Sequence, residues 1–301
     1  MQLRGIFPPL VTPFQDDGAI DLSGFEGNLE RYLAFDLAGY LVLGSNGEAQ
    51  ALSEDEKLRL IEAARRHAGH RSILAGTGLE STRATIELTK KAAGAGADAA
   101  LVLTPAYYKA QMTLDVLRGH FEAVAEASPI PVLLYSVPQF TGLPCPPALP
   151  AAVAAHPRIA GLKDSSGDLA LLGRIVASVP PAFAVLCGSA PVLYPSLCVG
   201  ATGGVVAVAC CAPRPAAALF RAFERGDHRA ARRIQEALTP LATAVTSSHG
   251  VAGLKAAMDV AGFKGGLPRA PLQAVHPASR ADLYPLLERA EAAVDSETLP
   301  S

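Results

Sequence analysis

Eight short apolar runs, separated by amphipathic helical stretches, constrain the fold of this 301-residue chain more than any other feature. The runs do not alternate between apolar and polar residues, which is typical of strands buried on both faces of a parallel sheet. Eight such strands with crossover helices predict a closed (β/α)8 TIM barrel, and an open doubly wound sheet is the alternative. The runs lie at residues 5–14, 38–44, 72–76, 99–105, 131–138, 159–163, 183–188 and 203–209.

The chain continues past the eighth run with further stretches of helical pattern, at residues 213–226, 228–246, 251–261 and 279–294. One helix completes the last β/α unit, so the others are surplus to a barrel. No Gly/Ser-rich or highly charged linker precedes them. We therefore expect residues 1–226 to form the barrel that carries the active site. Residues 227–301 are expected to form a C-terminal helical appendage packed on it, within the same structural unit.

Charge and cysteine usage narrow the functional classes. The formal net charge is -2 and the basic residues are dispersed, which argues against nucleic acid and membrane surfaces as partners. The N-terminus lacks the basic and apolar segments of a signal peptide, and no apolar stretch has the length of a membrane span. The cysteines show no CxxC pair, so we expect buried, reduced thiols in a cytoplasmic protein without a metal site. They are Cys145, Cys187, Cys198, Cys210 and Cys211.

Lys163 ends the sixth apolar run, where a lysine needs a physical reason. The loops that follow the strands form the active face of a barrel, and apolar walls there favour a neutral amine that can attack a ketone. Spacing alone leaves a second explanation open, namely a structural lysine paired with Asp164. The other lysines have ordinary settings, on amphipathic helices (Lys57, Lys90, Lys91, Lys255) or in loops (Lys109, Lys264).

Other strand ends also carry polar groups. The turn "GSNGE" at residues 44–48 offers a hydroxyl, an amide and backbone N–H groups to an anion, although a plain tight turn is the simpler explanation. Tyr135 ends the fifth run, and its phenol can transfer a proton or merely anchor a hydrogen bond. Tyr107 and Tyr108, after the fourth run, are typical of packing residues. The dinucleotide motif is incomplete, because "GTGLES" at residues 76–81 lacks a third glycine.

Taken in their order along the chain, several motifs resemble those of the pyruvate-dependent class I aldolase family that contains dihydrodipicolinate synthase and N-acetylneuraminate lyase. The resemblance runs from about Gly5 to Gln273. It rests on "GSNGE", "TPAYY", "YSVPQFTG", "GLKDSSGD" and "GATGGV". Within the family, "LAGTGLEST", "SPIPVLLYSVP", "GLKAAMD" and "RAPLQ" are most similar to the 4-hydroxy-2-oxoglutarate aldolase branch.

The resemblance implies a lyase that acts on small 2-oxo acids and requires no metal or organic cofactor. It makes Lys163 the Schiff-base lysine and Tyr135 the proton-transfer residue. It makes Tyr107 the tyrosine that reaches into the site of a neighbouring subunit, so a homo-oligomer, a dimer or a tetramer, is expected. The remaining positions are the carboxylate-binding Ser45 and Asn46 and the pocket-lining Ser165 and Gly188.

One departure from the family pattern bears on the substrate. Dihydrodipicolinate synthases usually carry an arginine two residues after the proline of the YxVP motif, where this chain has Phe140. A phenyl ring cannot offer a carboxylate the bidentate fork of an arginine. The expected reaction is therefore the reversible cleavage of 4-hydroxy-2-oxoglutarate to pyruvate and glyoxylate. The alternatives are dihydrodipicolinate synthase, an aldolase for a sugar-acid aldehyde, a non-catalytic barrel that senses a keto acid, and a nicotinamide enzyme.

Overall fold

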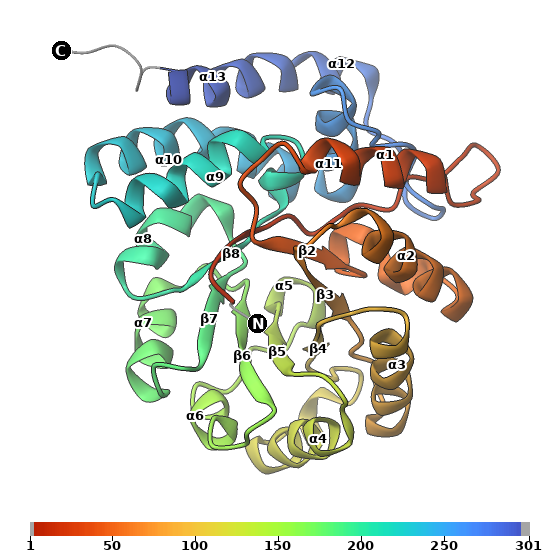
Figure 1. The fold of residues 1–301 in the computed structure, drawn as a ribbon, viewed down its shortest axis with the longest axis vertical. Coiled ribbons are helices and arrows are strands. Elements are labelled where there is room, and N and C mark those ends of the chain that lie inside the picture. The colour runs from red at the N-terminus through yellow and green to blue at the C-terminus, as the bar shows by residue number, and fades with distance from the viewer. Residues whose placement is uncertain (1–2, 296–301) are drawn as a thin grey trace.

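The computed structural model describes residues 3–295, and its centre is a barrel of eight parallel strands surrounded by helices (Figure 1). Neighbouring strands pair in chain order from β2 to β8, and β1 pairs with β8. Each apolar run of the sequence overlaps one strand, which confirms the barrel, and the open doubly wound sheet is wrong. The strands are β1 (Gly5–Phe7), β2 (Gly39–Val42), β3 (Ser72–Gly76), β4 (Ala99–Leu103), β5 (Val132–Ser136), β6 (Ile159–Asp164), β7 (Ala184–Cys187) and β8 (Gly203–Val205).

The barrel closes between β1 and β2 through a short bridge in place of a full ladder. Pro8 and Pro9 follow β1 directly, and neither has the N–H group that a continued strand would donate. Leu41 N donates to Pro8 O at 3.0 Å, and Leu10 N donates to Leu41 O at 2.8 Å. For this reason β1 is shorter than the predicted run at residues 5–14.

Two separate cores explain why the strand runs do not alternate. Leu133 of β5 packs inside the barrel with Leu41, Leu101 and Leu186, whereas the next residue, Leu134, packs against the surrounding helices. Successive side chains of a strand point to opposite faces, so a strand buried on both faces is apolar at every position.

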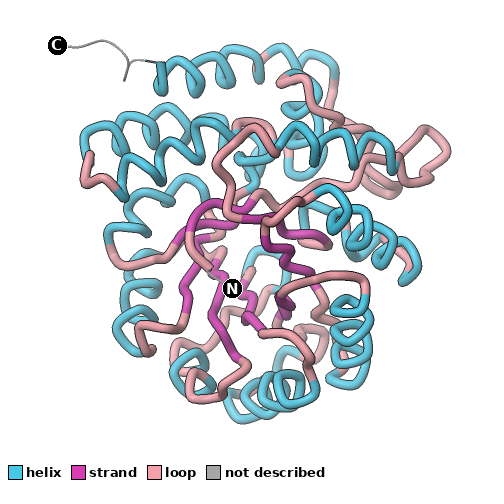
Figure 2. Tube along the Cα trace, in the orientation of Figure 1, coloured by secondary structure: helices cyan, strands magenta, loops and turns pink. Residues whose placement is uncertain are grey.

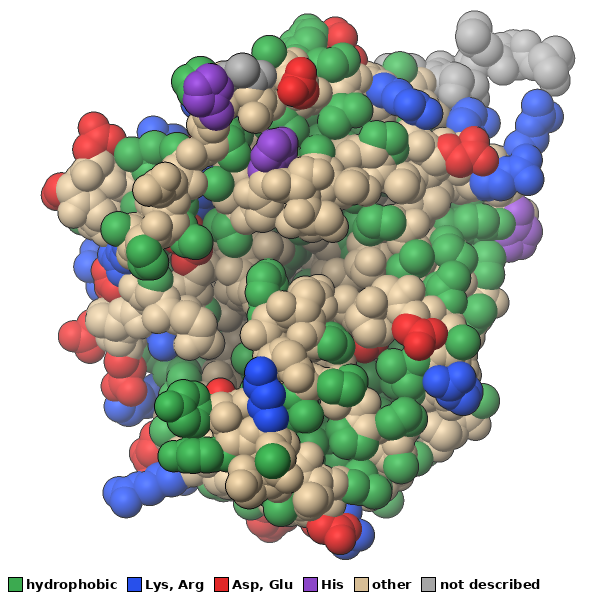
Figure 3. All heavy atoms as spheres, turned by 180° about the vertical axis from the view of Figure 1, so that it is seen from behind, with side chains coloured by type: hydrophobic (Ala, Val, Ile, Leu, Met, Phe, Trp, Pro, Cys, Tyr) green, Lys and Arg blue, Asp and Glu red, His purple; other side chains and the backbone are tan. Residues whose placement is uncertain are grey.

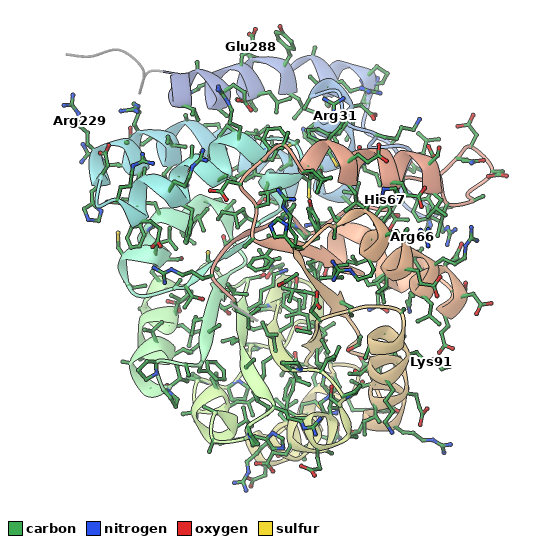
Figure 4. All side chains as sticks on the ribbon, viewed as in Figure 1. Arg31, Arg66, His67, Lys91, Arg229 and Glu288 are labelled. Atoms are coloured by element: carbon green, nitrogen blue, oxygen red, sulfur yellow. The ribbon has the colours of Figure 1, made fainter. Side chains whose placement is uncertain are left out.

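Helices surround the strands in the tube view (Figure 2). The second of them begins with a capping box, in which Ser53 Oγ accepts from Glu56 N at 3.2 Å and the Glu56 carboxylate accepts from Ser53 N at 2.8 Å. Charged side chains such as Arg66 and Lys91 point away from the barrel (Figure 4). The helices are α1 (Leu22–Tyr32), α2 (Glu54–His67), α3 (Thr82–Gly94), α4 (Leu114–Ala127), α5 (Pro138–Thr141), α6 (Leu149–Val153), α7 (Leu169–Ser178) and α8 (Leu193–Cys198).

The C-terminal helices form further layers at one side of the barrel (Figure 1). Here α10 packs against both α9 and α13, and α13 also contacts α9. The helical pattern at residues 279–294 is divided in two, because Asp282 separates α12 from α13 and aspartate favours a helix start over a helix interior. No helix within residues 3–295 is long and apolar enough to cross a membrane. These helices are α9 (Pro213–Glu224), α10 (His228–Thr243), α11 (Gly250–Val260), α12 (Pro277–Ala281) and α13 (Leu283–Asp295).

All five cysteines are free thiols. Cys145, Cys187, Cys210 and Cys211 are buried as expected, and the expectation is wrong for Cys198, which is exposed at the end of α8. Burial raises the pKa of Cys211 to about 12, so this thiol stays protonated at neutral pH.

His120 on α4 gives the fold a dependence on pH. It is buried with Nδ1 2.8 Å from Thr82 Oγ1, and burial lowers its pKa from 6.5 to about 4 against a smaller opposing effect of Glu80. The unfolded chain takes up this proton near pH 6.5, but the folded chain does not until about pH 4. Stability therefore falls as the pH drops through that window, by ~2 kcal/mol between pH 7.5 and pH 5.

This expectation is checked by the free energy of unfolding in urea at the two pH values, for the wild-type protein and for His120→Gln. Glutamine cannot be protonated, so the variant should lose ~2 kcal/mol less than the wild type over the same interval. Equal losses in the two proteins would show that the pH dependence comes from other groups.

Candidate active site

Tyr135 and Lys163 lie side by side near the carboxyl ends of β5 and β6. Their Cα atoms are partners in the strand register, and Lys163 Nζ lies 4.2 Å from the centroid of the Tyr135 ring. Both residues are buried, with exposed fractions of 4% for Lys163 and 7% for Tyr135. Two strand ends that the sequence singles out for their chemistry therefore meet in one buried place.

The alternation of β6 decides where Lys163 points. Leu162 packs in the core between strands and helices, so the next side chain faces the barrel interior. Asp164 faces the other way, and its carboxylate accepts from Ser166 Oγ at 2.5 Å and from Ser166 N at 3.3 Å. None of the ion pairs among residues 3–295 involves Lys163, so its interpretation as a structural lysine paired with Asp164 does not hold.

Several groups converge on the Tyr135 phenol. Burial acts to raise its pKa, but the charge of Lys163 and hydrogen bonds with Ser45, Lys163 and Ser165 outweigh burial and lower the pKa below its ordinary value of 10.0. Ser45 follows β2 and Ser165 follows β6, so residues from two parts of the barrel lower the pKa of the same phenol. A phenol with a lowered pKa is better suited to exchange a proton near neutral pH.

Gly188, directly after β7, leaves the space that Lys163 and Ser165 occupy. Its N–H donates to Asp164 O at 2.6 Å. A side-chain carbon at this position would lie 2.0 Å from Ser165 Oγ and 3.0 Å from Lys163 Cε. Only glycine allows the backbone after β7 to come this close to the lysine.

Ser45 and Asn46 lie in a tight 3₁₀ turn, Ser45–Gly47, that follows β2, and both are half-buried. Left-handed backbone flanks the turn, with φ of 62° at Leu43 and 54° at Glu48. Residues with side chains adopt this conformation only when their surroundings impose it. Contacts outside the turn must therefore hold it in shape.

Tyr107 is not part of the buried cluster. Its side chain is 77% exposed and packs edge to face on Tyr108, with ring centroids 5.0 Å apart. The Glu80 carboxylate fixes the loop by accepting from Ala106 N at 3.0 Å and from Tyr107 N at 2.8 Å. The structure thus leaves Tyr107 at the surface, whereas the other predicted site residues lie at the ends of β2, β5, β6 and β7.

Phe140 lies on α5, the short helix that follows β5, and is 68% exposed. A cation lies beside the same helix, because a side-chain carbon at Gly142, the residue after α5, would lie 2.6 Å from Lys109 Nζ. The positive charge of Lys109 therefore lies beside the helix that carries Phe140.

The expectation that Lys255 is an ordinary lysine of an amphipathic helix is wrong. It lies on α11 with only 1% of the residue exposed, and its Nζ lies 2.5 Å from Glu48 Oε1. Glu48 belongs to the same "GSNGE" turn as Ser45. The sequence contains a signal for this burial, since Lys255 follows Gly-Leu within an apolar run, as Lys163 does.

The carboxyl ends of the strands meet at a hollowed face of the molecule. In Figure 1 α5, the helix that follows β5, lies behind the strands. Figure 3 shows the opposite face, which is hollowed near its centre. Among residues 3–295, no group of three or more His, Cys, Asp or Glu side chains is placed to hold a metal ion.

Comparison with known proteins gives one consistent result. A family model described as "Dihydrodipicolinate synthetase family" matches residues 2–290. A 4-hydroxy-tetrahydrodipicolinate synthase of Exiguobacterium sp. is 35% identical over 286 residues, which cover 95% of this chain and 97% of that protein. The structure of dihydrodipicolinate synthase from Thermotoga maritima has a TM-score of 0.92 at 27% identity, covering 97% of this chain and 99% of that one. YagE of E. coli K12, a family member in complex with pyruvate, has a TM-score of 0.89 at 29% identity, with the same coverage of 97% and 99%.

Proposed function

Because the chain belongs to the dihydrodipicolinate synthetase family of pyruvate-dependent aldolases, we propose that Lys163 forms the imine of a class I aldolase. The observation that supports this assignment is the buried contact of Lys163 Nζ with the Tyr135 ring, made without an ion pair to any carboxylate of residues 3–295. A lysine amine that is not held in an ion pair is available to attack a carbonyl carbon.

In the proposed cleavage, the Lys163 amine adds to the C2 carbonyl of 4-hydroxy-2-oxoglutarate, and loss of water gives a protonated imine. Tyr135 takes the proton of the 4-hydroxyl group, and the C3–C4 bond breaks to release glyoxylate. The electron pair of that bond moves into the imine and gives the enamine of pyruvate. Protonation of C3 and addition of water then release pyruvate and regenerate the amine.

Ser45 and Asn46 are proposed to bind the carboxylate of the oxo acid. Their turn presents a hydroxyl, an amide and backbone N–H groups at a strand end, and Ser45 is among the residues that lower the pKa of Tyr135. Ser165 and Gly188 border the lysine directly, which supports their assignment to the wall of the same pocket.

Phe140 supports glyoxylate as the aldehyde. Aspartate semialdehyde carries a carboxylate and an ammonium group beyond its aldehyde carbon, and a phenyl ring at position 140 gives that carboxylate no partner. The carboxylate of glyoxylate is attached to the aldehyde carbon itself, so Asn46 and Ser165 can receive it close to the imine.

Dihydrodipicolinate synthase activity is the second candidate, in which the same enamine of pyruvate attacks aspartate semialdehyde. The named relatives favour it, because several are 4-hydroxy-tetrahydrodipicolinate synthases. The position of Lys109 Nζ beside α5 also favours it, since this cation could take the place of the missing arginine. The two candidates share Lys163 and the imine and differ only in the aldehyde.

Borohydride trapping tests the imine. Reduction of the protein in the presence of pyruvate should add a pyruvyl mass to the peptide that contains Lys163, and Lys163→Ala should abolish both trapping and turnover. Tyr135→Phe should still be trapped, but its kcat should fall by ~10²–10⁴, the usual contribution of a placed acid or base.

A label on Lys255 or Lys109 would overturn the assignment of Lys163. The absence of any adduct in the wild-type protein would favour a barrel that binds a keto acid without reacting with it. Near-normal kcat in Tyr135→Phe would show that water or another hydroxyl transfers the proton.

The aldehyde is tested by comparing kcat/KM for cleavage of 4-hydroxy-2-oxoglutarate with kcat/KM for condensation of pyruvate with aspartate semialdehyde. We expect kcat/KM for the cleavage to exceed kcat/KM for the condensation by ~10²-fold or more, because the distant carboxylate of the semialdehyde lacks a partner. Phe140→Arg should narrow this ratio by improving the condensation.

Lys109→Met is the matched control for the second candidate. If Lys109 replaces the arginine, the wild-type protein should use both substrates comparably, and the methionine variant should lose the condensation selectively. That pattern would overturn glyoxylate as the preferred aldehyde.

We also propose that Tyr107 completes the site of a neighbouring subunit. Tyr107, Tyr108 and Phe140 are large exposed aromatic side chains, which favour a protein surface as their partner. Tyr107→Phe and Lys163→Ala subunits should each be inactive alone, but a hybrid dimer has one site with both an intact lysine and an intact tyrosine. Co-expression in equal amounts should restore about a quarter of wild-type activity, because half of randomly formed dimers are hybrids.

The subunit experiment has a clear opposite result. If Tyr107 acts within its own chain, every site of the hybrid lacks one residue and no activity returns. A fully active monomer in sedimentation at the assay concentration would equally exclude the role across subunits.

A further inference from the structure

The second buried lysine, Lys255, lies on α11, where it meets the turn that follows β2. Its Nζ lies 2.5 Å from Glu48 Oε1, and the two side chains are 1% and 2% exposed. The same Nζ donates to Thr12 O at 2.8 Å and to Leu267 O at 2.7 Å. This ammonium group is therefore surrounded by two carbonyl oxygens and a carboxylate, all from the protein itself.

Glu48 connects this lysine to the turn through the backbone. Its N–H donates to Ser45 O at 3.1 Å and closes the turn, while its left-handed φ of 54° is imposed from outside. Its carboxylate reaches Lys255 with one oxygen and accepts from Arg269 N at 2.8 Å with the other. The direction of the Glu48 side chain therefore sets the orientation of the residues just before it.

Thr12 forms a second connection between the same two elements. Its carbonyl accepts from Lys255 Nζ, and its hydroxyl donates to Gly47 O at 2.7 Å. Gly47 fits closely, because a side-chain carbon there would lie 2.9 Å from Leu10 O. The turn is thus held from both sides by residues that Lys255 contacts.

A buried ion pair is a poor way to gain stability, because the loss of hydration offsets most of the attraction between the charges. Burial lowers the pKa of Lys255, and Glu48 opposes that shift. The pair instead fixes an orientation. Three acceptors hold the Lys255 ammonium group in place, and the ammonium group in turn holds the Glu48 carboxylate. Such fixed geometry matters most at the Ser45 turn, which follows β2 directly, as Tyr135 lies near the carboxyl end of β5.

We propose that the Glu48–Lys255 pair positions the Ser45–Asn46 turn for the carboxylate of the 2-oxo acid. Neither residue is catalytic, and both act through the turn. The role rests on the proposed function, because it assumes that this turn binds the oxo acid. It also assigns α11 a part in oxo-acid affinity, although this helix lies in the C-terminal part of the chain.

The test uses Glu48→Gln/Lys255→Met, which removes both charges together and leaves no unpaired ion in the core. The measurement is the rate of borohydride trapping as a function of pyruvate concentration. The half-saturating pyruvate concentration should rise ~10-fold or more, as for the loss of a hydrogen bond to a charged group, while the maximal rate stays within a few-fold of wild type.

The matched control is Arg65→Met/Asp98→Asn, which removes an ion pair of 3.1 Å between α2 and the residue before β4, at the opposite end of the barrel. This control should lose stability without a change in half-saturating pyruvate. If the first double variant does not fold, Thr12→Val replaces it, because it removes the Gly47 hydrogen bond and keeps every buried charge paired. It should also raise half-saturating pyruvate.

Unchanged half-saturating pyruvate in a folded variant would overturn the positioning role, as would an equal rise in the control. A fall in the maximal rate alone would also overturn it, since that would place the pair in the chemical step. These outcomes leave the proposed function intact, whereas absence of trapping in the wild-type protein would overturn both.

Discussion

The contact between the Lys163 ammonium group and the Tyr135 ring is the interaction on which the arrangement of the site depends. It requires β5 and β6 to be adjacent, parallel and in register, and Tyr135 and Lys163 are register partners. It also requires room, which Gly188 provides after β7. A cation over an aromatic ring is held only modestly, by ~0.5–2 kcal/mol, so the fold fixes the position of this amine without an ion pair.

The strand framework could be predicted because its cause is local. A strand buried on both faces must be apolar at each position, so each run is visible in the sequence, and Lys163 is conspicuous because it ends such a run. The limits of the strands depend on single residues whose effect is also local. Pro8 and Pro9 end β1 because they lack N–H groups. The chain after β2 enters a tight 3₁₀ turn at Ser45.

The contacts across the barrel could not be predicted from the sequence in the same way. Tyr135 can be recognised as a residue at a strand end, but its partner depends on which strands are neighbours and in what register. The pattern predicts Lys255 on an amphipathic helix, but the small residues around it on α11 do not show which face of that helix is buried. Its carboxylate partner, Glu48, lies in the N-terminal half of the chain, so no periodicity connects the two.

The two buried lysines show why burial alone does not identify a nucleophile. Both follow Gly-Leu in an apolar segment, and both lie beside an aromatic ring, since Lys255 Nζ is 4.6 Å from the Phe14 centroid. Lys255 also has a carboxylate and two carbonyl oxygens around it, and each of these stabilises the charged ammonium form. Lys255 is therefore surrounded by acceptors that connect it to the turn, whereas Lys163 has no carboxylate partner among residues 3–295 and is the lysine proposed to attack a carbonyl.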